Sequence, residues 1–129
     1  MTRREKAIEN HKKGYNCAQA VLCAFSDKIG MNEDELFRLS EAFGGGMGGT
    51  QGVCGAVSAM VFVVGALKSK GVDMLPDTNK KESYAFAAKL MKEFEDRVAS
   101  SVCKEIKEKN LISCDGCIEE AVKILEENI

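Results

Sequence analysis

The sequence predicts an all-α fold: a compact single-domain helical bundle of five to seven helices, with a buried central helix after a Gly-rich loop. Three observations lead to this prediction. Capping residues precede several apolar segments, apolar residues recur three or four positions apart, and one apolar run is too long for an ordinary strand. The 129 residues suit one domain, expected over 1–129.

Three segments in the first half of the chain begin at capping residues. Thr2 and Glu5 form a T-x-x-E capping box, so a short polar helix is expected over about 3–13. Two further helices are expected, over 17–29 after Asn16 and over about 33–43 after Asn32. Gly30 is expected to end the first of these two.

The second half contains the longest apolar run, 53–67. Its MVFVV segment alone would suit a buried strand, but the length of the run favours a helix. Because the run is apolar on all sides, it is expected to be the central, buried helix. Three more helices are expected: a long one over 80–98, a short one holding Cys103 and Ile106, and a last one, DGCIEEAVKILEE, capped by Ser113.

Composition and charge exclude several classes of protein. The net charge is −2, so no general basic field is available for nucleic acid. The first residues are charged and no apolar segment of a signal peptide follows them. The run 53–67 is shorter than a membrane-spanning helix, so no membrane insertion is expected. The protein is expected to be cytoplasmic.

The stretch GGGMGGTQGVCGA, residues 44–56, contains Gly44, Gly46 and Gly49 in a literal G-x-G-x-x-G pattern. A dinucleotide-binding turn needs a preceding strand, whereas the segment before it here is predicted to be helical. No Gly-Lys-Ser/Thr follows, which excludes a Walker A loop. A flexible linker remains the simple alternative. We favour a tight turn that delivers Cys54 to the first turn of the buried helix.

Six cysteines are many for a chain of this size: Cys17, Cys23, Cys54, Cys103, Cys114 and Cys117. Without a secretory signal, a static disulfide framework is not expected, so metal binding or reversible redox chemistry is favoured. The only histidine, His11, lies in a charged segment and is expected to be solvated. A metal site would therefore be built mostly from sulfur.

The positions of the cysteines favour shared chemistry. Cys17, Cys54 and Cys114 are each predicted in the first turn of a helix, where free N–H groups favour negative charge. Cys114 and Cys117 form a C-x-x-C, which fits a redox pair or half of a four-thiolate metal site. Cys23 lies six residues after Cys17, so it faces elsewhere and is expected in the core.

With these features the chain resembles the family of redox-active proteins named C_GCAxxG_C_C after its cysteine pattern. The resemblance runs from about residue 14 to 125 and rests on GYNCAQAV, GGGMGGTQGVCGAVSA, FEDRVASSVCKEI and CDGCIEEAVKILEE. It implies four characteristic cysteines, Cys17, Cys54, Cys103 and Cys114, with Cys114 preferred over Cys117 for the last. Ala59 stands where the motif has a third small residue, glycine, and Cys117 and Cys23 are additional.

Three functions follow from these features. The first is thiol–disulfide or electron transfer, with Cys54 as the thiolate, Cys17, Cys103 or Cys114 as its partner, and Cys117 as a resolving thiol. The second is a metal or iron–sulfur carrier, in which Cys17, Cys54, Cys103 and Cys114 bind zinc or a cluster. The third is a helical interaction module whose cysteines only pack. The sequence does not identify the redox partner, and it is compatible with a homo-oligomer. Both chemical alternatives require these sulfurs to meet in one pocket.

Overall fold

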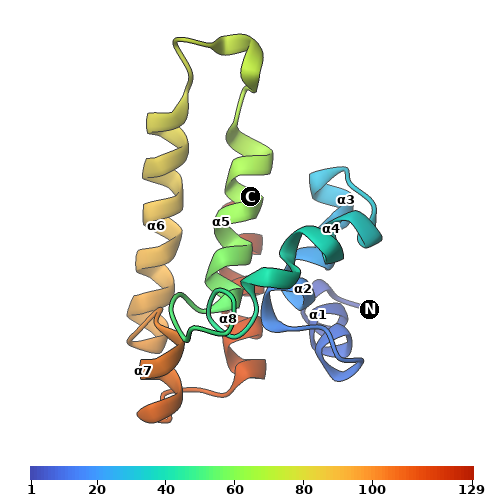
Figure 1. Cartoon of the computed structure of the whole chain (residues 1–129), viewed down its shortest axis with the longest axis vertical. Coiled ribbons are helices and arrows are strands. Elements are labelled where there is room, and N and C mark those ends of the chain that lie inside the picture. The colour runs from blue at the N-terminus through green and yellow to red at the C-terminus, as the bar shows by residue number, and fades with distance from the viewer.

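The structure is a computed structural model that describes all of residues 1–129 and is built from helices (Figure 1). It contains no strand, and its one isolated β-bridge joins Val53 to Val102. The α-helices are α1 (Arg3–Lys12), α2 (Cys17–Cys23), α3 (Ser26–Ile29), α4 (Glu33–Ser40), α5 (Gly55–Lys68), α6 (Lys80–Val98), α7 (Cys103–Glu108) and α8 (Cys114–Asn128). Two 3-10 helices, η1 (Glu41–Phe43) and η2 (Val72–Met74), complete the elements. The all-α prediction is confirmed.

Helices α5 and α6 lie side by side and are joined at their far end by the loop that holds η2 (Figure 1). Helices α1 to α4 gather on the other side of α5. Helix α8 contacts α1, α2, α5 and α6, so it ties the two halves of the molecule together. None of the helices combines the length and the apolar character that crossing a membrane requires.

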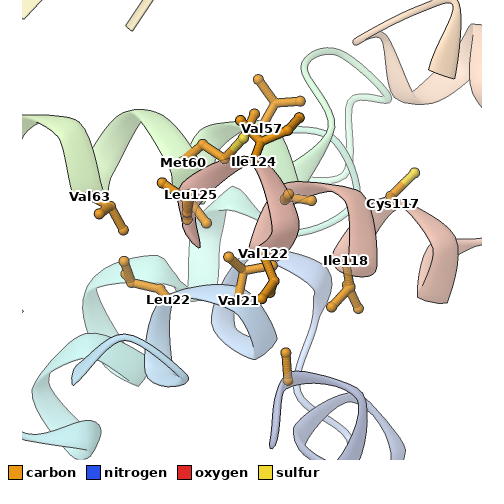
Figure 2. Packing of buried hydrophobic residues seen from close by; sticks show 14 of the residues in the cluster. Val21, Leu22, Val57, Met60, Val63, Cys117, Ile118, Val122, Ile124 and Leu125 are labelled. Atoms are coloured by element: carbon orange, nitrogen blue, oxygen red, sulfur yellow. The ribbon is translucent and has the colours of Figure 1, made fainter. Parts of the chain in front are cut away.

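The hydrophobic core is one cluster formed mainly by α2, α5, α6 and α8. Figure 2 shows Val21 of α2 close to Val122 of α8, and Met60 of α5 near Leu125. The expectation of a buried central helix holds for the first part of α5 only. Residues 65–68 are exposed, because the end of α5 projects with α6 beyond the rest of the bundle.

The helix expected over 17–29 is divided into α2 and α3, so the structure has eight α-helices instead of five to seven. The backbone tightens where α2 ends: the N–H of Ala24 donates to Val21 at 3.1 Å and that of Phe25 to Leu22 at 3.0 Å. This turn buries the Phe25 ring completely, with the Arg3 guanidinium 4.9 Å from its centroid. A tertiary contact from α1 therefore competes with continuation of the helix.

Candidate functional site

Five of the six cysteines line one cavity of about 420 Å³. They are Cys17, Cys54, Cys103, Cys114 and Cys117. The sixth, Cys23, is buried outside the cavity, with its sulfur 3.7 Å from the carbonyl oxygen of Glu33. Sulfurs that are up to a hundred residues apart in the chain thus meet in one place, as both chemical interpretations of the sequence require.

Each sulfur reaches the cavity from a helix start or from the turn that follows one. Cys17, Cys103 and Cys114 are the first residues of α2, α7 and α8, and Cys54 immediately precedes α5. Cys117 lies one turn into α8. Its side chain points away from Ile118, which packs into the core on the other side of the helix (Figure 2). The α8 helix therefore presents two thiols to the cavity and apolar side chains to the bundle.

The glycine stretch is a compact loop held by its own hydrogen bonds. The N–H of Gln51 donates to Gly45 at 2.9 Å, and the N–H of Gly52 donates to Gly46 at 2.8 Å. Gly46 has a φ of 72°, and a Cβ there would lie 2.7 Å from the Cβ of Cys103. These bonds do not fit a flexible linker, and the helices α4 and η1 precede the loop where a dinucleotide site needs a strand.

The exit from this loop runs beside the start of α7. The N–H of Cys103 donates to the carbonyl oxygen of Gly52 at 2.7 Å, and the N–H of Cys54 donates to that of Ser101 at 2.8 Å. Together with the bridge between Val53 and Val102, these bonds hold the two segments in register. The backbone of Cys54 is therefore fixed next to that of Cys103.

Gly55 brings the starts of α2 and α5 into contact. A Cβ on Gly55 would lie 3.1 Å from the backbone nitrogen of Ala18 and 3.4 Å from the Cβ of Cys17. Any larger residue would push the two helices apart. The glycine thus allows Cys17 to approach Cys54, although the two residues come from different helices.

The environment of Cys54 stabilises its thiolate. A hydrogen bond from the thiol of Cys117 is the main influence that lowers the pKa of Cys54 to about 7. Burial opposes this effect, whereas the N–H groups of Ala56 and Val57 and the positive charge of Lys107 add to it. The surroundings of Cys54 therefore favour its ionised form despite burial.

The partner thiols show the opposite behaviour. The hydrogen bond to Cys54 raises the pKa of Cys117 above its ordinary value, and burial raises it further. Burial, followed by the charges of Cys114 and Cys54, raises the pKa of Cys17 to about 12. Among Cys17, Cys54 and Cys117, only Cys54 therefore has a pKa below its ordinary value.

His11 does not stand free in solvent, so that expectation is wrong. Its Nδ1 lies 2.6 Å from a carboxylate oxygen of Asp115, and the ring lines the cavity next to the start of α8. The packing of α1 against α8 creates this pair. The two residues are 104 positions apart, so no local pattern could have revealed it.

The side chains do not form a metal-binding group as they stand. No three His, Cys, Asp or Glu side chains lie close enough together to hold a metal ion. Zinc and iron–sulfur sites need three or four ligands around one centre. The carrier alternative with Cys17, Cys54, Cys103 and Cys114 as ligands would require these side chains to rearrange around one centre.

Comparison with known proteins adds one finding. A family model described as "Putative redox-active protein (C_GCAxxG_C_C)" matches residues 15–128. No curated protein and no solved structure matches the chain. The matched region includes all six cysteines and every residue that lines the cavity except His11.

Proposed function

We propose that this chain, which belongs to the C_GCAxxG_C_C family, is a thiol–disulfide redox protein in which Cys54 and Cys117 interconvert between dithiol and disulfide. The observation that carries the proposal is that both residues line the same cavity, where the thiol of Cys117 is the largest influence on the pKa of Cys54. This supports Cys117 as the resolving thiol for a thiolate at Cys54. A cytoplasmic location belongs to the same proposal, because free cysteines persist in reducing compartments.

The reaction begins at Cys54. Its thiolate attacks one sulfur of a disulfide substrate, one substrate thiolate leaves, and a mixed disulfide with Cys54 forms. The sulfur of Cys54 then carries no charge, so the main influence that held the proton on Cys117 is gone.

Cys117 completes the reaction. It loses its proton and attacks the sulfur of Cys54, which releases the second substrate thiolate. The two released thiolates take up the two protons that Cys54 and Cys117 have lost. Two electrons have passed from the protein to the substrate, whose disulfide is reduced to two thiols while Cys54 and Cys117 become a disulfide. The reverse sequence would oxidise a dithiol substrate.

Counting free thiols tests this proposal. Anaerobically purified protein should contain six free thiols, and one equivalent of diamide at pH 7 should remove two of them. In Cys117→Ser the loss should be at least about tenfold slower, because the thiol that most strongly influences Cys54 is gone and burial raises the pKa of Cys17. Cys23→Ala is the matched control and should lose two thiols at the rate of the unmodified protein, since Cys23 lies outside the cavity.

Two outcomes would contradict the proposal. An unchanged thiol count after oxidation would favour a helical interaction module whose cysteines only pack. Stoichiometric zinc or iron in the anaerobic preparation, lost on replacing Cys54 by serine, would favour the metal carrier instead.

A further inference from the structure

We infer that the substrate is a small disulfide that carries a carboxylate, bound in the cavity by Lys107 and the glycine loop. This inference rests on the proposed function and specifies the substrate class of the same site. Three observations support it: the size of the cavity, the charges around it, and two backbone N–H groups of the loop.

The size of the cavity suits a small molecule. Its volume of about 420 Å³ lies within the range of ordinary ligand pockets, roughly 300–1,000 Å³. Cys54 and Cys117 are 5% and 3% exposed, so a substrate must enter the cavity to reach them. A disulfide held on the folded surface of a large protein would not reach these sulfurs, whereas a small disulfide can enter.

The charges around the cavity favour an anion. No Asp or Glu lines it, and its ionisable residues other than cysteine are His11 and Lys107. His11 is already paired with Asp115. Lys107 forms no salt bridge within the chain, and its positive charge acts on Cys54. A free ammonium group therefore stands near the reactive sulfur, where it can pair with a carboxylate.

The glycine loop supplies neutral donors. Gly45 and Gly46 line the cavity with φ values of 63° and 72°, and their N–H groups donate to no acceptor within the chain. Neighbouring N–H groups of the loop are taken: those of Met47 and Gly48 donate to Phe43 and Ala42. Backbone N–H groups in such turns commonly bind anions. Lys107 and these two groups can share one carboxylate.

The net charge of the chain works against an anion preference. At −2, the protein as a whole attracts cations and repels anions at long range. A preference for a negatively charged disulfide would therefore have to come from the cavity itself. Comparing substrates of opposite charge therefore tests directly whether the cavity selects an anion.

Three disulfides of similar size serve as probes: 3,3′-dithiodipropionate, which is negative, 2-hydroxyethyl disulfide, which is neutral, and cystamine, which is positive. The measured quantity is the rate at which each oxidises Cys54 and Cys117 in the full chain. Each rate is divided by the rate of the same disulfide with a small uncharged thiol, which removes differences in intrinsic reactivity. The normalised rate of dithiodipropionate should exceed that of cystamine by about tenfold or more.

Lys107→Gln should reduce this ratio to within about threefold, since it removes the ammonium group while leaving the thiols in place. Its effect on the pKa of Cys54 changes all three rates together and cancels in the ratio. Lys104→Gln is the matched control: Lys104 is exposed on the same helix, α7, but does not line the cavity, so the ratio should stay as in the unmodified protein.

Equal normalised rates for the three probes, or a ratio that Lys107→Gln leaves unchanged, would overturn the inference and leave the proposed function intact. The same holds if diamide oxidises the pair but none of the three disulfides does. If diamide also fails to oxidise Cys54 and Cys117, the proposed function itself falls.

Discussion

Replacing Cys54 by serine is expected to abolish the loss of two thiols on oxidation and the reaction of iodoacetamide with the most reactive thiol at pH 7. The hydrogen bond from Cys117 lowers the pKa of Cys54 to about 7, so about half of Cys54 is thiolate at that pH. An ordinary thiol with a pKa of 9.0 would be only about 1% thiolate. The unmodified protein should therefore show one alkylation site whose rate reaches half its maximum near pH 7.

Two substitutions at Cys117 separate the hydrogen bond from the disulfide. Cys117→Ser keeps a donor beside Cys54, so the alkylation midpoint should stay near pH 7 although no disulfide can form with residue 117. Cys117→Ala removes the donor, which is the largest influence lowering the pKa of Cys54, so the midpoint should move to higher pH. Identical alkylation profiles for the two variants would mean that Cys117 does not stabilise the thiolate.

Replacing Gly46 by alanine is expected to cause a large loss of stability and to disturb the site. Gly46 has a φ of 72°, a conformation that costs an L-residue about 1–2 kcal/mol. An added Cβ would also lie 2.7 Å from the Cβ of Cys103 and 2.8 Å from the Cα of Gln51, contacts too short for the loop to accept without moving. This overpacking should add about 1–3 kcal/mol.

Gly49→Ala is the matched control, because Gly49 has nearly the same φ, 73°, but nothing within 4 Å of its added Cβ. Gly49→Ala should lower the free energy of unfolding only by the conformational cost of the positive φ. Urea unfolding of both variants gives the two free energies of unfolding, and the difference between them measures the contact with Cys103. Equal losses would show that the loop does not close tightly over α7. A slower oxidation of Cys54 in Gly46→Ala alone would show that the same contact also positions the site.

Local signals in the sequence predict most of the fold. The capping residues Thr2, Asn16, Asn32 and Ser113 each accept a hydrogen bond from a backbone N–H in the first turn of the helix that follows. The long helix expected over 80–98 has the bounds of α6. Such features depend on neighbours within a few residues, which is why the sequence alone reveals them.

The sequence-based expectations that proved wrong depend on contacts between distant segments. The break after α2 accompanies the burial of Phe25 under Arg3 from α1, and the position of His11 depends on Asp115 near the other end of the chain. The exposed end of α5 is a third case, since its apolar sequence gives no sign that it projects beyond the bundle.

For the candidate site, the sequence indicates the residue types and the role of the glycines but not the pairing of the thiols. Cys114 precedes Cys117 by one turn of the same helix, and both line the cavity. Only the packing of α8 against α5 brings Cys117 into the same cavity as Cys54. The contribution of Lys107 also requires the fold, because a lysine on a short polar helix looks like any solvated residue.

Mapping the disulfide after oxidation with one equivalent of diamide tests the central claim most directly. Cleavage at Asp115 separates the peptides that hold Cys114 and Cys117, and the Cys23→Ala background leaves Cys17 as the only cysteine of its tryptic peptide. The peptides containing Cys54 and Cys117 should then be joined by a disulfide. Oxidised protein in which Cys54 and Cys117 both remain free thiols would contradict this claim.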